Sequence, residues 1–287
     1  MKKILALCIV STCMIVVFLF TGCQKDAKDP LDKDELVPCQ VQKIVIPGSL
    51  LVASNRIQQR PYIAQNIPYK VQHLSGGIAP GASDTLIFTY NKSGNPVSGI
   101  HQMNIGENLL FRYDKWNRLT EYINIYPDEL GDYWHKYTYD NKKSDQIIAD
   151  TAFRDFVSSN GKLINYNDID LTTFKYDSKG RISQSTEYVL GDTIVRLYNY
   201  NAQGNLQNPG SVYDNKLNIH LTNKIWMFID RDYSINNPVD NGNYTYNSMG
   251  LPITINTNSQ SVVAGFQFIV IGYPFGISKD IIYYSCP

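Results

Sequence analysis

The sequence predicts an all-β protein, an antiparallel up-and-down meander of hairpins with little helix. One motif recurs along most of the chain: an aromatic residue, any residue, then Tyr, then Asp or Asn, usually with Gly a few residues later. Because side chains alternate along a strand, the aromatic and the Tyr lie on one face, and the polar residue begins a turn. No sustained apolar stripe of period 3.6 appears, so few helices are expected.

The clearest copy of the motif runs from Phe174 to Ser183, with Tyr176, Asp177 and Gly180 in the expected places. The Gly stands where a hairpin loop needs a positive φ. The other copies have their tyrosines at Tyr90, Tyr113, Tyr139, Tyr200 and Tyr246. Two copies depart from the pattern: Trp116-Asn117 stands where Gly is expected, and 142–144 replaces the turn after Asp140. We interpret each Tyr-Asp pair as a strand end with a turn cap, rather than as a repeated ligand site.

The turn residues of these repeats divide the chain into predicted strands. A first strand over Val41–Ile46 ends at Pro47-Gly48, and residues 55–84 read as irregular strands and loops. Strands are then predicted near 85–90, 97–103, 107–113, 118–126, 133–139, 146–156, 163–176, 181–190, 193–200, 219–229, 243–246, 251–257 and 264–285. Gly191-Asp192 is a candidate tight turn, and Leu217–Asp230 is the one segment where a helix is the alternative.

The copies resemble the YD repeats of Rhs-type proteins, most closely from Tyr176 to Ile182. Rhs shells have a more regular period than these unevenly spaced tyrosines, which argues against a toxin-enclosing shell. The pattern suits shorter Bacteroidetes lipoproteins built from a few such units, a DUF family of unknown function described as having a porin-like fold. The segments 213–216, 236–238 and 246–252 and the ending Tyr284-Ser285-Cys286 also look like the C-terminal part of that family. The resemblance spans roughly 85–287.

The sequence leaves the closure of the meander open. A long meander has two edges with unpaired backbone groups, and it can close as a barrel, fold into two layers, or remain an open curled sheet. Its strands do not keep one apolar face, since Arg112 and Lys175 oppose the aromatic positions. We therefore take "porin-like" as a description of shape.

The N-terminus predicts export and attachment to a membrane. Lys2 and Lys3 precede an apolar run from Ile4 to Phe20, which is typical of a secretory signal peptide. Thr21-Gly22-Cys23 resembles the bacterial lipobox, although Phe20 stands where Leu is usual. The resemblance implies cleavage before Cys23 and attachment to the membrane through lipid on its sulfur. A plain secreted protein or an uncleaved anchor is the alternative.

The segment after Cys23 predicts exposure at the cell surface. Residues 24–29 read as a charged, solvated tether and resemble the acidic export signal of Bacteroidetes surface lipoproteins. On that resemblance the chain is an outer-membrane lipoprotein facing outward. The expected organisation is a signal peptide over 1–22, a tether over 23–38 and a single all-β repeat domain over 39–287.

Composition excludes one class of partner. Loss of Lys2 and Lys3 reduces 26 basic residues to 24, against 26 acidic residues, so the balance is −2. No basic stripe suited to nucleic acid is present. Two cysteines outside the signal peptide and lipid site remain, Cys39 and Cys286; in an oxidising compartment they either pair and tie the ends together or stay as buried thiols.

A search for chemistry predicts no catalytic residue, cofactor or metal site. The histidines His73, His101, His135 and His220 have no partner at metal-ligand spacing in the sequence. The stretch Asp230-Arg231-Asp232 with Asp240 lacks the Gly and closing Glu of an EF-hand, although a looser calcium site stays open.

No P-loop, dinucleotide fingerprint or nucleophile elbow occurs. Asp128 and Glu129, with Tyr133 and Trp134 nearby, could imitate a carbohydrate site, but 127–132 also reads as a hairpin loop, which we favour.

Three functions remain. The first is a surface-anchored, non-enzymatic module that binds a glycan or a protein. The second is a glycan-active hydrolase using loop carboxylates. The third is a structural component of an envelope complex, with edge strands pairing to a partner chain. We expect the first.

Overall fold

The computed structural model describes residues 36–46, 84–102, 108–125, 132–140, 144–207, 211–239, 242–257 and 279–286, and it confirms the predicted all-β class. The regions 47–83 and 258–278 lie outside this description. The strands are β1 (Gln40–Ile46), β2 (Asp84–Tyr90), β3 (Pro96–His101), β4 (Asn108–Tyr113), β5 (Leu119–Ile125), β6 (Tyr133–Tyr139), β7 (Ile147–Arg154), β8 (Val157–Ser159), β9 (Lys162–Asn165), β10 (Asp168–Tyr176), β11 (Ile182–Val189), β12 (Asp192–Leu197), β13 (Tyr213–Leu217), β14 (Asn236–Pro238), β15 (Gly242–Tyr246), β16 (Pro252–Thr257) and β17 (Lys279–Ser285).

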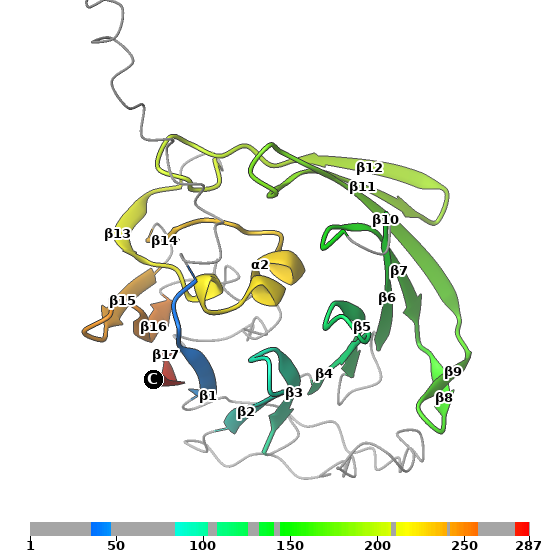
Figure 1. Cartoon of the computed structure of the whole chain (residues 1–287), viewed down its shortest axis with the longest axis horizontal. Coiled ribbons are helices and arrows are strands. Elements are labelled where there is room, and N and C mark those ends of the chain that lie inside the picture. The colour runs from blue at the N-terminus through cyan, green and yellow to red at the C-terminus, as the bar shows by residue number, and fades with distance from the viewer. Residues whose placement is uncertain are drawn as a thin grey trace, which may run out of the picture.

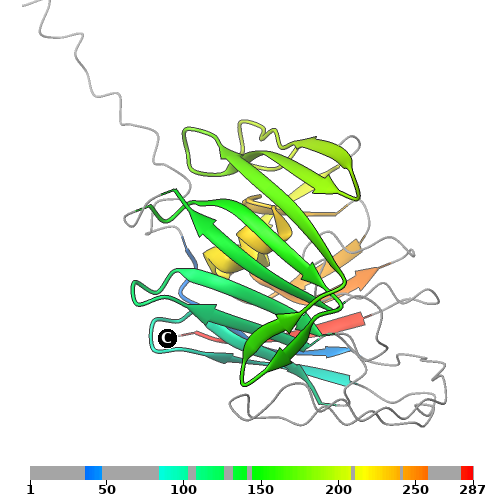
Figure 2. The ribbon, with the colours of Figure 1, turned by 90° about the vertical axis from the view of Figure 1, so that its right-hand side faces the viewer.

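One antiparallel sheet of thirteen strands makes up most of the described fold. Its order is β12-β11-β10-β7-β6-β5-β4-β3-β2-β1-β17-β16-β15, so neighbours along the chain are mostly neighbours in the sheet. The sheet curls around a short helix, α2 (Lys224–Asp230), and leaves β12 and β15 as its two end strands (Figures 1 and 2). The meander is therefore an open curled sheet among the described strands.

The polar residue caps its turn, as predicted, in five of the six repeats, and the turn after Asp140 lies partly outside the described residues. The Asp177 carboxylate accepts hydrogen bonds from the backbone N–H groups of Lys179 and Arg181, at 2.9 and 3.0 Å. Gly180 then takes a φ of +75°. The same pattern recurs at Asn91, Asp114, Asn201 and Asn247. Where Gly is missing, Asn117 takes the positive φ, at 63°, as Asn tolerates better than most residues.

Most of the repeat tyrosines fasten their hairpin to a neighbouring strand, whereas Tyr246 donates to the Asp214 carboxylate instead. Tyr113 Oη donates a hydrogen bond to the carbonyl of Pro96, the first residue after the turn of the hairpin before it, at 2.6 Å. Four further tyrosine hydroxyls do the same across their own neighbours: Tyr139 to Leu119, Tyr176 to Ile147, Tyr200 to Ile182 and Tyr284 to Pro252. Each of these bonds ties a strand end to the adjacent returning strand, so a polar hydroxyl can lie among packed rings without loss of its partner.

The interior of the curl holds helix where a strand was predicted. The predicted strand near 219–229 is wrong: a 3₁₀ turn, η2 (Ile219–Thr222), is followed by α2. The buried Trp226 ring of α2 meets the edges of Phe88 and Phe111 at centroid distances of 5.4 and 5.5 Å. Because this helix is apolar on several sides, it has no polar stripe, and its sequence looks like a strand.

A smaller apolar cluster lies on the outer face of the sheet. Leu110, Ile123 and Trp134 are buried there, although the inner face of the same strands already packs against α2. The hairpin β8–β9 adds Leu163 to this cluster, and Phe156 meets Trp134 edge-on at 5.2 Å. Arg112 anchors the hairpin by donating to the carbonyl of Gly161 at 2.8 Å. The sheet thus carries apolar residues on both faces at its centre.

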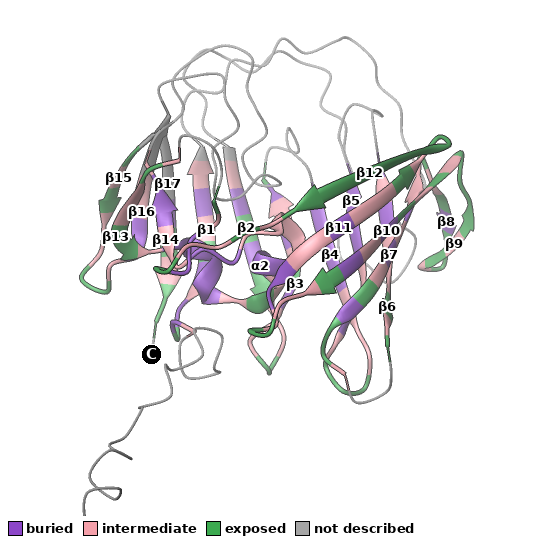
Figure 3. Ribbon diagram, turned by 90° about the horizontal axis from the view of Figure 1, so that it is seen from above, coloured by how far each residue is buried: buried purple, intermediate pink, exposed green. Residues whose placement is uncertain are grey.

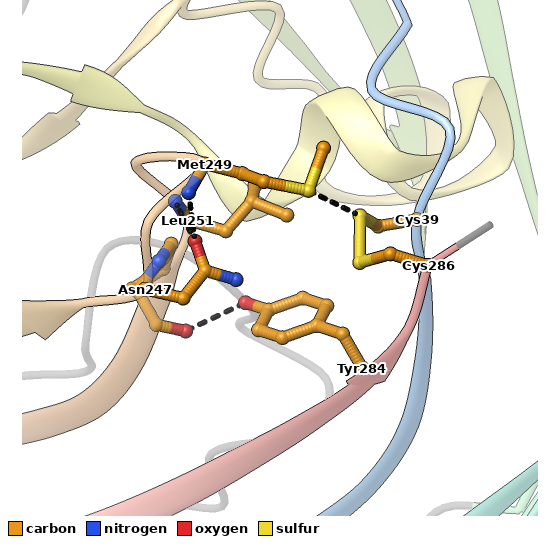
Figure 4. The surroundings of a disulfide bond; sticks show 7 residues. Cys39, Asn247, Met249, Leu251, Tyr284 and Cys286 are labelled. Atoms are coloured by element: carbon orange, nitrogen blue, oxygen red, sulfur yellow. Dashed lines mark hydrogen bonds between the residues drawn. A yellow bond between two sulfur atoms is a disulfide. The ribbon is translucent and has the colours of Figure 1, made fainter.

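The two ends of the described chain meet within the sheet. β1 pairs with β17, and Cys39 and Cys286 form a disulfide beside Met249, whose sulfur lies 3.4 Å from that of Cys39 (Figure 4). Val37, which falls in the predicted tether, is buried and donates its backbone N–H to the carbonyl of Leu221 at 3.1 Å. The described packing therefore includes residues before Cys39 that the sequence predicts as part of the tether. Cys23 lies outside the described residues, and no described helix has the length and apolar character needed to cross a membrane.

Replacement of Asp177 tests the capped turn. Asp177→Ala removes the acceptor for two backbone N–H groups and the ion pair with Arg181, so we expect a loss of about 1–2 kcal/mol in the free energy of unfolding. Asp177→Asn keeps the acceptor that Asn already supplies in other copies and should cost less than about 1 kcal/mol. Urea unfolding measures both. Equal losses would show that the charge, and not the cap, stabilises the turn.

Candidate functional site

A cavity of about 970 Å³ lies where the capped turns of the sheet meet the start of α2. Its walls come from the turns after β2, β4, β6 and β10, from η2 and α2, and from the segments around both cysteines of the disulfide. These turns lie at the same end of their strands because the strands alternate in direction (Figure 2). The repeat itself therefore assembles the cavity wall.

The helix is fixed to this wall by one side chain. Asn223 caps α2 by accepting a hydrogen bond from the N–H of Ile225 at 2.9 Å. Its amide also donates to the carbonyl of Gly94, in the turn after β2, at 3.0 Å. Ile225, Met227 and Phe228 then line the cavity from the helix side. The cavity floor is apolar because α2 presents these side chains to it.

A stack of rings and cations forms one side of the cavity. The Arg118 guanidinium lies 4.3 Å from the Tyr139 ring centroid and 5.0 Å from that of Trp116. It also pairs with Asp114 at 2.8 Å and donates to the carbonyl of Ser144 at 2.9 Å. Burial alone would raise the pKa of Asp114, but hydrogen bonds from Arg118 and Trp116 outweigh this and hold that pKa below its usual value. Arg118 is thus held in place by these contacts, and Asp114 neutralises its charge at the cavity wall.

The remaining polar groups at the cavity are less constrained. Trp116 keeps 49% of its surface exposed, so its indole edge is accessible although Lys115 lies over the ring. Lys179 and Lys224 are exposed on two different walls, and Asp145 lies on a third. The cavity thus combines an apolar floor with an accessible ring and charged groups of both signs.

Two tyrosines at the cavity have strongly altered acidity. Burial raises the pKa of Tyr139, and the neighbouring Arg118 offsets this only in part. Burial also raises the pKa of Tyr176, with a further contribution from Tyr139. Both hydroxyls donate to backbone carbonyls and therefore need their protons.

The other residues singled out from the sequence are dispersed. His135 lies in β6 and pairs with Asp150 at 2.9 Å, and His101 is buried in β3. Trp134 is buried in the outer cluster, so it cannot present its ring to a sugar. Asp128, Glu129, His73 and Asp240 lie outside the described residues. The arrangement imagined around Trp134 as a carbohydrate site is therefore not supported by the position of its ring.

His220 has a partner that sequence spacing did not reveal. Its Nε2 lies 2.6 Å from an Asp230 carboxylate oxygen, and Asp232 is 3.8 Å from its Nδ1. Burial would lower the pKa of His220, but the hydrogen bond and the charges of both carboxylates outweigh it and raise that pKa. Within the described residues no group of three or more His, Cys, Asp or Glu side chains has a geometry that could hold a metal ion.

The cavity tyrosines predict sensitivity to alkali. Their pKa values are raised in the folded state, so their contribution to stability is complete below the unfolded value of about 10 and falls as the pH rises above it. We expect the free energy of unfolding to be steady up to that pH and to decline beyond it. Urea unfolding across the range, followed with tyrosinate absorbance, measures this. Tyr139→Phe and Tyr176→Phe should each flatten the decline, and an unchanged slope in both would contradict the assignment.

Comparisons with known proteins do not assign a family. No protein-family model matches the chain, and no curated protein matches it. Among solved structures, the chain is similar to a porin-like protein from Bacteroides uniformis, with a TM-score of 0.34 and 9% sequence identity. That match covers 85% of this chain and 98% of the other.

Proposed function

We propose that the protein is a surface-anchored lipoprotein that binds a glycan or protein ligand without transforming it. The observation that carries the proposal is the cavity at the turn end of the sheet. Its volume of about 970 Å³ lies within the range of ligand sites, and its lining combines apolar side chains of α2 with polar groups from the turns. The lipobox-like Thr21-Gly22-Cys23 supports the lipid anchor, and the charged residues after it support export to the cell surface.

The cavity suits recognition because its walls are held rigid. The turns after β2, β4 and β10 are capped by their own Asp or Asn side chains, and Asn223 bonds the helix to the first of them. The disulfide Cys39–Cys286 fixes a further wall. A preformed site loses less conformational entropy when a ligand binds, so modest contacts can give useful affinity. Trp116 offers an apolar ring edge, while Lys179, Lys224 and Asp145 offer hydrogen bonds to hydroxyl or amide groups.

Binding is tested with the purified chain on arrays of glycans and of extracellular-matrix peptides, with any hit followed by calorimetry. We expect saturable binding without product formation. Trp116→Ala should weaken that binding about tenfold or more, because it removes the accessible ring of the cavity. Tyr166→Ala is the matched control, since Tyr166 is also an exposed aromatic (39%) but belongs to the opposite end of the strands. Turnover of a bound glycan would favour the hydrolase instead.

The anchor is tested on cells. Protease added to intact cells should digest the protein if it faces outward, and a Cys23→Ala variant should be released from the membrane fraction. Digestion only after lysis would contradict surface exposure and would move the search for ligands to the interior of the envelope. Retention of the Cys23→Ala variant in membranes would contradict the lipid anchor.

A further inference from the structure

The strand β12 ends the sheet with an exposed sequence, half of which is apolar. All six of its residues are exposed (Figure 3), and Ile194, Val195 and Leu197 keep 42%, 54% and 69% of their surfaces open. The turn before it adds Leu190, which is 77% exposed. Sheet edges are usually protected by Lys, Pro or a bulge, because their backbone groups can pair with another strand. Neither Lys nor Pro occurs in β12, and its register with β11 runs without a bulge.

The pairing with β11 decides which backbone groups of β12 face outward. Val189 and Asp192 flank the two-residue turn, and Tyr198 donates its N–H to the carbonyl of Ser183 further along the same ladder. Hydrogen-bonded pairs alternate along an antiparallel ladder, so Asp192, Ile194 and Arg196 direct their backbone groups towards β11. Thr193, Val195 and Leu197 therefore direct their N–H and C=O groups away from the sheet.

We propose that β12 pairs with β12 of a second copy of this chain, across a two-fold axis that passes through Ile194 and runs normal to the sheet. Such an axis makes the two strands antiparallel and keeps the inner face of each sheet on the same side. Thr193 of one copy then exchanges backbone hydrogen bonds with Val195 of the other. Ile194 faces its own counterpart in the closer, non-hydrogen-bonded type of pair.

Charge selects this register over its neighbours. With the axis at Ile194, Asp192 of each copy lies opposite Arg196 of the other, and the symmetry repeats that pair. An axis at Val195 would place Arg196 opposite Ile194, and one at Thr193 would place Asp192 opposite Ile194. Opposite charges that face each other across strands stabilise a pairing, and a charge facing an apolar chain does not.

The positive charge of Arg196 is only partly balanced within its own copy. Within its own copy it pairs with Glu187, but Glu187 also accepts a hydrogen bond from Arg231 at 2.6 Å. One carboxylate thus faces two guanidinium groups, and Arg196 is the more exposed of the two, at 48% against 24%. A carboxylate from a second copy would balance the cluster.

Apolar burial adds to the pairing at its two ends. The same register places Leu197 opposite Gly191 of the other copy, next to Leu190 in the turn. Leu190 and Leu197 are the two most exposed large apolar side chains among the described residues, and each would gain a partner. The other sheet end offers no such match, because β15 presents the exposed polar residues Asn243 and Thr245. Pairing of β12 with itself therefore closes a dimer and leaves β15 outside it.

A charge exchange tests the register. Sedimentation velocity of the purified full chain in mild detergent, over a range of concentrations, should show a reversible dimer. Asp192→Lys should weaken that dimer about tenfold, because two repulsive pairs replace two attractive ones. Arg196→Glu should do the same, and the double variant D192K/R196E should restore dimerisation. Thermal unfolding of each variant excludes loss of the fold as the cause.

A cysteine scan tests the axis independently. Ile194→Cys should form an intermolecular disulfide under mild oxidation, since its two copies face each other, whereas Thr193→Cys and Val195→Cys should not. Monomer at all concentrations would overturn the proposal. Open polymers would overturn it too, because they require pairing of two different edges. Failure of the double charge variant to restore the dimer, or efficient cross-linking at 195 alone, would overturn the register. None of these outcomes depends on the ligand proposed for the cavity.

Discussion

The hydrogen bond from a tyrosine hydroxyl to the carbonyl of the neighbouring hairpin underlies the whole sheet. It joins the end of one repeat to the first residue after the turn of the repeat before it, as between Tyr113 and Pro96. These tyrosine rings pack in the interior while their hydroxyls stay paired with backbone carbonyls, so their burial leaves no unpaired hydroxyl. The order of the turns at one end of the sheet follows from this link, and the cavity wall follows from the order of the turns.

The helix inside the curl determines how far the sheet can close. Trp226 and Phe228 on α2 reach strands on different sides of the interior, including Phe88 in β2 and Phe174 in β10. The sheet therefore wraps around a filled centre, and β12 and β15 stop before they meet (Figure 1). A buried ion pair, His220 with Asp230, lies at the two ends of the same helical segment. Since both groups are enclosed, their pairing offsets the cost of removing each from water.

The repeat was predictable because its information is local. Tyr, Asp and Gly within a few residues define a strand end, a cap and a turn, and the turn at Asp177 forms as its sequence predicts. The helix was not predictable from spacing, because Ile225 to Ile229 is apolar throughout and only its position inside the curl makes it a helix. The cavity depends on residues as distant as Gly94 and Asn223, and no local pattern records that contact. His220 and Asp230 were both noted from the sequence, but their meeting depends on the same unexpected helix.

The place of the chain ends in the sheet has a consequence for topology. β1 and β17 are neighbours inside the sheet, joined through Cys39 and Cys286, whereas both sheet edges are formed by strands from within the chain. If β15, β16 and β17 are placed before β1, the order of the strands in the sheet follows their order along the chain without a break. A circular permutant that begins at β15 would therefore trace the same sheet as a simple meander. In the natural order, the pairing of β1 with β17 can form only once β17 has been synthesised.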